Sequence, residues 1–114
     1  MPRYRGLTLR VLGGRAPAMG PGKAELIEHI AQTGSISAAA RAMRMSYRRA
    51  WQLVEALNND YRERLVITAA GGTRGGGARV TPFGKRVVAE FRAMEHKASA
   101  AIAGDLRRFR RYIP

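Results

Sequence analysis

The 114-residue chain contains no cysteine, which excludes a disulfide framework and any metal site built on thiolates. It also has no apolar run near the ~20 residues that a membrane-spanning helix needs. The N-terminal stretch MPRYRGLTLRVLGG lacks the apolar segment of a signal peptide. We therefore expect one small cytoplasmic domain without membrane association, in which dimerisation adds stability to a limited core.

Acidic residues are scarce and unevenly placed. Lysine and arginine number 21 against 8 aspartates and glutamates, a formal net charge of +13. Such an excess indicates a polyanionic partner, most often nucleic acid, although arginine-rich composition also partly reflects a GC-rich genome. Residues 35–52 and 71–86 carry only basic charges, and residues 105–114 hold four arginines against Asp105. This segregation of charge favours a nucleic-acid surface.

Catalytic and metal-binding patterns are also missing. His29 and His96 fall on separate expected helices, and the chain has no H-E-x-x-H motif, no arguable Ser-His-Asp set and no paired carboxylates. The stretch GGTRGGG (71–77) is not a nucleotide loop, because Gly77 is followed by a strand-like segment instead of Lys-Ser/Thr and a helix. We expect neither an enzyme nor a bound cofactor or metal ion.

The N-terminal third is expected to form a strand, a loop and a helix. LTLRVL (7–12) alternates apolar and polar residues, as a short strand does. Residues 13–22 are rich in glycine and proline, which indicates a loop. A helix over 21–33 follows, with Pro21 in its first turn and Gly34 as its stop.

Residues 35–59 fit a helix-turn-helix. Ser35 or Ser37 can cap a short helix that ends near Met43, and Ser46 can cap a second helix after a turn of about three residues. Small alanines stand where the two helices must approach closely. The second helix is expected to bury one face, which consists of Tyr47, Ala50, Trp51, Val54, Leu57 and Asn58.

The hydrophobic period changes after the second helix. RLVIT (64–68) and ARVT (78–81) are strand-like, so the glycine-rich stretch between them predicts the tip of a β-hairpin, the wing of a winged helix. Thr81 as cap and Pro82 as first residue begin a long helix, whose apolar stripe is longer than this domain needs. Pairing of two copies through the stripe is therefore favoured over a monomer. The predicted dimerisation residues are Phe83, Val87, Phe91, Met94, Ala98 and Ala101.

The expected fold is mostly α-helical with a small β-hairpin wing. A winged helix-turn-helix DNA-binding domain is expected over residues 1–81, with its wing at 64–81. Residues 82–114 are expected to form a long dimerisation helix followed by a basic C-terminal tail.

The exposed side of the second helix supplies candidate DNA contacts. Burial of the Tyr47 and Trp51 face turns Arg49 and Gln52 toward solvent, and Arg48 lies near the helix start, where base edges are usually reached. Arginine binds guanine, and glutamine binds adenine, in a bidentate way. Trp51 is expected in the core, and the Tyr47 ring can lie in the core while its hydroxyl reaches a phosphate. The candidate DNA-binding residues are Arg41, Arg44, Ser46, Tyr47, Arg48, Arg49, Gln52, Thr73, Arg74 and Arg79.

Two stretches, TGSISAAARAMRMSYRRAWQLVEALNN and GGTRGGGARVTPFGKRVV, resemble the N-terminal DNA-binding domain of the ModE family of molybdate-responsive transcription regulators, a winged helix related to the LysR type. The resemblance covers roughly residues 24–92. It implies that residues 46–52 open the recognition helix, that 73–77 form the wing tip and that 83–103 dimerise. ModE proteins also carry C-terminal oxyanion-binding domains, for which a chain ending at Pro114 has no room. We therefore expect no molybdate binding by this chain alone.

The leading interpretation is a sequence-specific transcription regulator that binds a palindromic operator in double-stranded DNA as a homodimer. Arg49, near the start of the second helix, is expected to contact a base, whereas Arg74, on a glycine tip, is expected to contact the DNA backbone or the minor groove. One alternative is a sequence-indifferent, nucleoid-type DNA binder, which the net charge permits. A weaker alternative is an RNA-binding protein that uses Arg74-Gly75-Gly76 as a small RGG segment. The sequence leaves the operator, the regulated genes and any effector open.

Overall fold

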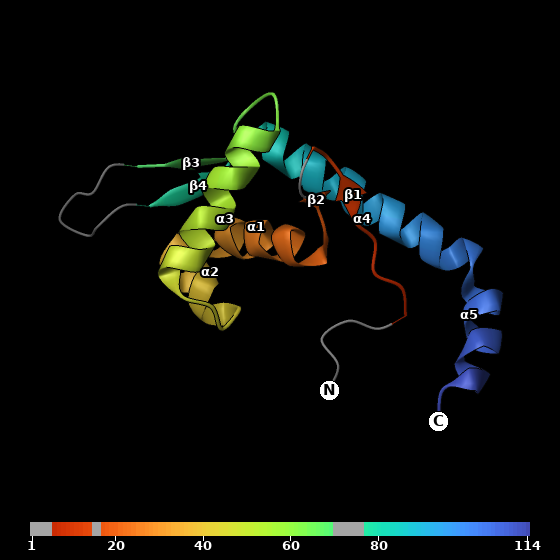
Figure 1. Ribbon diagram of the computed structural model, residues 1–114. Helices are drawn as coiled ribbons and strands as arrows, with labels where there is room; N and C mark the ends of the chain where they lie inside the picture. Colours follow the sequence, from red (N-terminus) through yellow and green to blue (C-terminus); the bar gives the residue numbers. More distant parts are fainter. Residues whose placement is uncertain (1–5, 15–16, 70–76) are drawn as a thin grey trace.

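The computed structural model describes residues 6–14, 17–69 and 77–114. Helices α1 to α3 and the β3–β4 hairpin gather at one end, and α4 runs away from them toward the C terminus (Figure 1). In chain order the elements are β1 (Val11–Leu12), β2 (Pro17–Met19), α1 (Pro21–Thr33), α2 (Ile36–Ala42), α3 (Tyr47–Asp60), β3 (Val66–Thr68), β4 (Ala78–Val80), α4 (Pro82–Ala101), α5 (Ala103–Phe109) and the 3-10 turn η1 (Arg110–Tyr112).

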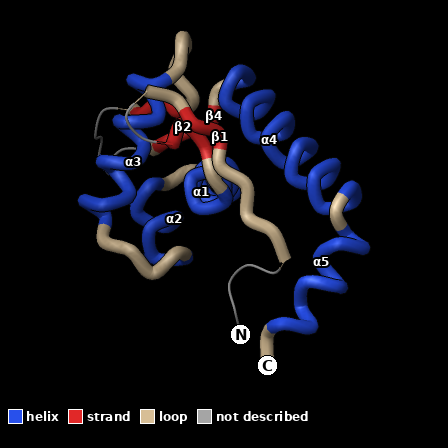
Figure 2. Tube along the Cα trace, turned by 45° about the vertical axis from the view of Figure 1, so that its right-hand side comes forward, coloured by secondary structure: helices blue, strands red, loops and turns tan. Residues whose placement is uncertain are grey.

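Helix α1 is the centre of the domain, with α2, α3, α4 and the two small sheets around it (Figure 2). Its apolar residues Leu26, Ile27 and Ile30 are at most 1% exposed. Pro21 is the first residue, and the helix ends at Gly34, whose φ of +70° suits glycine and whose N–H donates to the Ile30 carbonyl at 2.8 Å. These bounds confirm the helix predicted over 21–33.

Helices α2 and α3 form the predicted helix-turn-helix. Ser35 caps α2 by accepting a hydrogen bond from the Ala38 N–H at 3.0 Å, so Ser35, and not Ser37, fills this role. Ser46 caps α3 by accepting from the Arg49 N–H at 3.0 Å, as predicted. The small residues that let the helix backbones approach closely are Ala39, Ala40 and Ala50, none more than 2% exposed.

The β3–β4 hairpin is the base of the predicted wing. Its antiparallel register places Val66 opposite Val80 and Ile67 opposite Arg79. Successive side chains of a strand alternate, so the two valines are buried in the core while Ile67 and Arg79 face outward. The hairpin therefore has one face on the domain and one face in solvent.

Two sets of hydrogen bonds fix the wing to the helix-turn-helix. The Ala78 N–H donates to the Gly34 carbonyl at 2.9 Å, which joins β4 to the corner between α1 and α2. The Asn58 side chain of α3 accepts from the N–H groups of Leu65 and Val66 at 2.9 and 3.2 Å and donates to the Val66 carbonyl at 3.0 Å. The base of the wing is thereby held against α3.

The N-terminal strand prediction is wrong in extent. Only Val11–Leu12 of the 7–12 segment is a strand, and it pairs with β2, which lies inside the segment 13–22 that was expected to be a loop. Both β1 residues are exposed, and the core contact of this hairpin is Met19, which is 1% exposed. A strand forms only where a partner lies alongside, and alternation within one segment does not reveal that partner.

Helix α4 begins as predicted, and its first half belongs to the domain core. Thr81 caps it by accepting from the Gly84 N–H at 2.9 Å, and Pro82 is its first residue. Val88 and Phe91 are 7% and 1% exposed and lie in the same core as the α1 residues. The core therefore continues past residue 82, where the sequence placed a boundary.

An ion pair fastens the middle of α4 to α1. The Arg92 guanidinium lies 2.7 Å from the Glu28 carboxylate of α1 and 2.8 Å from the Glu95 carboxylate of α4. The hydrogen bond to Glu28 is the main cause of the raised pKa of Arg92. Beyond this point α4 leaves the core and ends before Ile102, and none of the residues of α5 is buried.

The predicted dimerisation stripe divides at the ion pair. Phe91 is buried in the core of its own domain, and Phe83 and Val87 pack partly buried against that core, so the N-terminal half of the stripe is occupied within one copy. Met94, by contrast, is 43% exposed, and Ala101 is exposed. Ala98, between them, is partly exposed. Only the C-terminal half of the stripe is available to a second copy.

Candidate nucleic-acid interface

Helix α3 buries one narrow face. Ala50, Val54 and Leu57 are at most 3% exposed. At 3.6 residues per turn, the side opposite these three residues carries Arg48 and Gln52, and both are exposed. In helix-turn-helix proteins the second helix presents such a side to the major groove of DNA. We refer to Arg48 and Gln52 as the ridge of α3.

Tyr47 and Trp51 do not belong to the buried face, which corrects the sequence prediction that placed Trp51 in the core. Tyr47 is 55% exposed and Trp51 is 43% exposed. Without the two rings, the centre of the buried face shifts, and the outward side of α3 turns by roughly 40° from Arg49 toward Arg48. The i, i+4 spacing of two aromatic residues is the same on a buried and on an exposed stripe, so periodicity could not separate them.

Tyr47 and Trp51 line a groove between α3 and the wing, with a volume of 280 Å³. Its other walls come from the start of α2 and from the base of the β3–β4 hairpin. We call it the wing-side groove. Its lining includes Ser35, Ser37, Tyr47, Trp51, Thr68 and Ala78.

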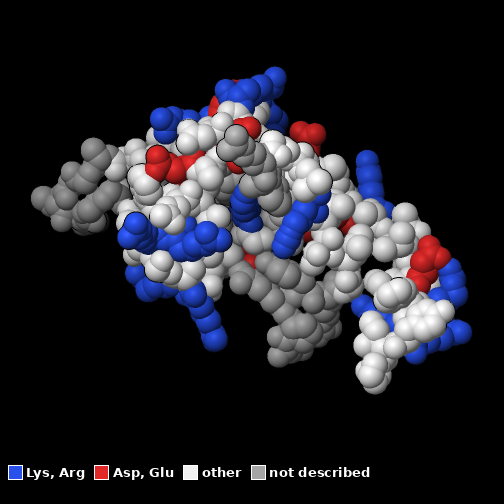
Figure 3. Space-filling model, in the orientation of Figure 1, with Lys and Arg blue, Asp and Glu red and all other residues white. Residues whose placement is uncertain are grey.

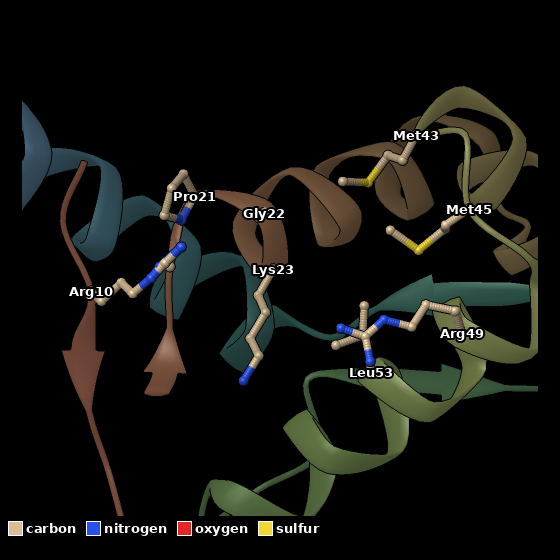
Figure 4. A pocket seen from close by; sticks show the side chains of 9 residues that line it. Arg10, Pro21, Gly22, Lys23, Met43, Met45, Arg49 and Leu53 are labelled. Atoms are coloured by element: carbon tan, nitrogen blue, oxygen red, sulfur yellow. The ribbon is translucent and has the colours of Figure 1, made fainter. Parts of the chain in front are cut away.

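The opposite flank of α3 carries Arg49, which lines a second cavity, of 270 Å³, between α3, the turn and the start of α1 (Figure 4). Arg10 and Lys23 bring two further cationic side chains to this cavity. Its apolar lining includes Met43, Met45 and Leu53. Arg49 therefore lies on a flank of α3 and not on the ridge, which corrects the prediction that it points most directly outward.

Basic side chains gather over α2 and the start of α3 (Figure 3). Residues 35–52 contain no acid, and the first acidic residue of α3 is Glu55. The Arg41 guanidinium donates to the Ser37 hydroxyl at 3.0 Å, which holds one positive charge beside the wing-side groove. A region of one charge sign on an exposed surface attracts a polyanion. The exposed arginines of this region are Arg41, Arg44, Arg48 and Arg49.

The structure brings most of the predicted DNA-binding residues together and separates the rest. Ser46 lies at the start of α3, but its hydroxyl oxygen is engaged in capping the helix. Arg79 lies on the outer face of the wing and lines a different cavity together with Lys85. Thr73 and Arg74 lie outside the described residues. The exposed residues gathered around α2, the turn and the start of α3 are Arg41, Arg44, Tyr47, Arg48, Arg49 and Gln52.

Several residues of this surface were not predicted from the sequence. The sequence pattern predicts Trp51 in the core and indicates no role for Thr68, Arg10 and Lys23. Each lines its cavity only because segments distant in sequence meet there: β3 beside the start of α2, and Arg10 with the start of α1 across from α3. No local pattern marks such a meeting point.

The described part of the chain holds neither a metal cluster nor a membrane span. There, no three or more histidine, cysteine, aspartate or glutamate side chains gather into a group that could hold a metal ion. Among the described helices, none is both long enough and apolar enough to cross a bilayer.

Comparison with known proteins agrees with this architecture. Residues 22–85 match the family described as bacterial regulatory helix-turn-helix protein, lysR family. The molybdenum transport protein ModE of Azotobacter vinelandii is 35% identical over 107 residues, covering 84% of this chain and 40% of that protein. The DNA-binding transcriptional dual regulator ModE of Escherichia coli (strain K12) is 40% identical over 68 residues, covering 60% of this chain and 26% of that protein.

Among solved structures, the full-length LTTR LysG from Corynebacterium glutamicum with bound effector Arg matches with a TM-score of 0.53 at 23% identity, covering 77% of this chain and 29% of that one. This likeness supports the winged-helix fold.

The chain spans two fifths or less of the length of these relatives. The family match runs from α1 to the first turn of α4 and so contains the helix-turn-helix and both strands of the wing. The resemblance to ModE is confirmed, and the family and the E. coli relative are regulators, not enzymes, as predicted. The expectation about molybdate stays a prediction. The chain belongs to the lysR family of bacterial regulatory helix-turn-helix proteins.

Proposed function

We propose that this chain is a DNA-binding transcription regulator of the ModE type that reads double-stranded DNA through the ridge of α3. The observation that carries the proposal is the ridge itself: Arg48 and Gln52 stand exposed, opposite the buried face, in a stretch without acids. Arginine can bind O6 and N7 of guanine, and glutamine can bind N6 and N7 of adenine. The ridge thus carries the side chains that distinguish base pairs in the major groove.

The flanking arginines support the proposal as phosphate contacts. Arg41, Arg44 and Arg49 are exposed on the elements that border the ridge. Contacts to phosphates fix the position of the protein on the duplex without reading its sequence. If a dimer neutralises ~6–10 phosphates, the logarithm of the binding constant should fall with the logarithm of salt concentration at a slope of about −5 to −9.

A homodimer on a palindromic operator is the second part of the proposal. We propose that the contact between copies lies on the C-terminal half of α4, and the exposure of Met94 and Ala101 beyond the ion pair with α1 supports this position. Two recognition helices related by twofold symmetry would meet two half-sites of a palindrome.

Binding of the wild type and two variants to a library of randomised duplexes, at two salt concentrations, tests the proposal. Gln52→Ala should cost ~1–3 kcal/mol on the best site and relax the preference at one position of each half-site. Arg41→Ala is the matched control for a phosphate contact. It should weaken binding to all sequences by similar factors and make the salt slope shallower by about one for each phosphate that is no longer neutralised.

The same experiment distinguishes the alternatives. A specific regulator should prefer its site by ~10³-fold or more, whereas a nucleoid-type binder would enrich no sequence. A stronger affinity for single-stranded RNA than for any duplex would favour the RNA-binding alternative. If Arg41→Ala changed the base preference and Gln52→Ala did not, the ridge would not be the base-reading surface. Arg74→Ala extends the comparison to the wing tip, where a uniform loss of affinity is expected.

A further inference from the structure

The wing-side groove contains Trp51, the only tryptophan of the chain. The exposed part of its ring is neither packed in the core nor part of the ridge. Trp51 is 43% exposed and lines the groove beside Tyr47, which is 55% exposed. Large aromatic rings contribute most to binding when they are covered, and here two exposed rings lie together in one groove, which favours a contact there. A binding partner that covers the two rings must also match the chemistry of the other residues that line the groove.

The walls beyond the two rings are polar. Ser35 and Ser37 lie at the start of α2, and Thr68 ends β3. The Ser35 hydroxyl accepts from the Ala38 N–H, and the Ser37 hydroxyl accepts from the Arg41 guanidinium, each at 3.0 Å. A hydroxyl that accepts a hydrogen bond still carries its own proton and can donate it to another oxygen. The groove thus combines an aromatic wall with a wall of hydroxyl donors.

The groove is held in shape by the contacts that anchor the wing. The Ala78 N–H donates to the Gly34 carbonyl at 2.9 Å and fixes the wall between β4 and α2. The Asn58 side chain bonds Leu65 and Val66 and fixes β3 against α3. Because both walls are anchored within the domain, an occupant would not need to order them, which lowers the entropic cost of binding.

We infer that the wing-side groove receives one sugar-phosphate strand of a DNA duplex, with Trp51 packed against deoxyribose and the hydroxyls of Ser37 and Thr68 donating to phosphate oxygens. This inference rests on the proposed function. A DNA strand alternates apolar sugar surface with anionic groups that only accept hydrogen bonds, and so it matches both walls. The positive charges of Arg41 and Arg48 favour this strand over a protein partner, whose surface carries both signs of charge.

The position of the ridge also supports a DNA strand in the wing-side groove. When Arg48 and Gln52 point into the major groove, the two flanks of α3 face the phosphate backbones that border that groove. The wing-side groove lies along one of these flanks, since Tyr47 and Trp51 of α3 form its wall. One backbone strand would then run between α3 and the base of the wing.

Fluorescence tests the inference directly, because Trp51 is the single tryptophan. The full chain is titrated with a labelled duplex whose anisotropy reports binding, and quenching of Trp51 by neutral acrylamide is measured on the same samples. Bound duplex should shield the ring and reduce the quenching. The matched control is the double variant Trp51→Phe, Ala100→Trp. Its tryptophan replaces an exposed residue near the C-terminal end of α4, outside the basic segment 105–114 and far from the wing, so its quenching should not change (Figure 1).

Affinity gives a second readout. Trp51→Ala should weaken binding to every duplex by about tenfold, and the base preference should stay unchanged because a backbone contact carries no sequence information. Trp51→Phe keeps an aromatic ring and should retain most of the affinity. Thermal unfolding of both variants checks that they fold. If Trp51→Ala does not fold, the quenching of the wild type decides.

Several results would overturn the inference. Unchanged quenching of Trp51 in the bound complex, with full duplex affinity of Trp51→Ala, would remove the groove from the interface and leave DNA binding by the ridge intact. A changed base preference in Trp51→Ala would make Trp51 a base-reading residue. Stronger shielding of Trp51 by single-stranded than by duplex DNA would assign the groove to base stacking. Absence of any duplex binding by the wild type would instead refute the proposed function itself.

Discussion

A methyl group on Gly84 would lie 3.0 Å from the α-carbon of Leu65 and closer still to the Leu65 carbonyl oxygen. The first turn of α4 therefore rests directly on the backbone that leads into β3. Thr81 holds the same junction, because its hydroxyl donates to the Arg64 carbonyl at 2.7 Å while its oxygen caps α4 at the Gly84 N–H. Close packing of α4 on the wing therefore explains why threonine stands at position 81 and glycine at position 84, two residues that carry part of the family resemblance.

Gly84→Ala should lower the free energy of unfolding by ~1–3 kcal/mol, because backbone on both sides of the contact must move. Gly104→Ala is the matched control: Gly104 is also helical, but the nearest atom to its added methyl is the flexible end of the Arg107 side chain at 3.6 Å. That substitution should raise stability by ~0.5–1 kcal/mol through helix propensity. Urea unfolding of both variants measures the difference. Equal effects at the two glycines would contradict the close contact.

Arg44 has a φ of 56°, the left-handed conformation that glycine adopts most easily, in the turn between α2 and α3. Arg44→Gly should therefore raise the free energy of unfolding by roughly 0.5–1 kcal/mol. It should also weaken DNA binding, because it removes a positive charge beside α3. Arg44→Ala is the control, since it removes the same charge and keeps the strain. It should lose the same affinity without gaining stability, as measured by urea unfolding and duplex titration.

The Tyr61 hydroxyl donates to the Ala18 carbonyl at 2.9 Å and joins the end of α3 to β2. Burial, and to a lesser extent the charge of Asp60, raises the pKa of Tyr61 above its ordinary value of 10.0. A raised pKa in the folded state contributes stability that is fully present below pH 10.0 and is lost as the pH rises, because the unfolded chain releases this proton first.

Tyr61→Phe should cost ~1 kcal/mol at neutral pH through loss of the hydrogen bond. The difference in stability between wild type and Tyr61→Phe should shrink as the pH rises from neutral to above 10.0. Denaturant titrations of both proteins over this range measure it, and the other titrating groups cancel in the comparison. A difference that grew with pH would mean that the folded state favours the ionised phenol.

Met94→Glu should disrupt the proposed dimer, because it places a charge on the exposed C-terminal half of the α4 stripe. The dissociation constant of the dimer should rise by about tenfold or more. Ala100→Glu adds the same charge on the other side of the helix and should leave the dimer intact. Sedimentation of both variants over a range of concentrations checks the result. A wild type that stays monomeric at all concentrations would refute the dimer itself.

The sequence determined the elements that depend on neighbouring residues. Ser46 and Thr81 cap helices, Pro82 begins one and Gly34 ends one, because each of these signals acts through the backbone of the next few residues. Helical spacing with small alanines predicted the helix-turn-helix, and the strand pair with a glycine-rich connection predicted the wing. Helical spacing also predicted Arg49 and Gln52 to be exposed, and Arg48 was predicted near the exposed start of the helix; all three are exposed.

Only the tertiary structure decided which apolar residues are buried. Trp51 and Phe91 both lie on apolar stripes of regular helical spacing, yet Trp51 lines an open groove and Phe91 is enclosed by α1 and its neighbours. The helical spacing of apolar residues predicts which of them share a side of a helix, but their burial depends on what packs against that side. The buried side of α3 packs against α2, and its Asn58 bonds the base of the wing, while α4 packs against α1 and β4. The way these segments meet is decided by the fold and is invisible to a local pattern.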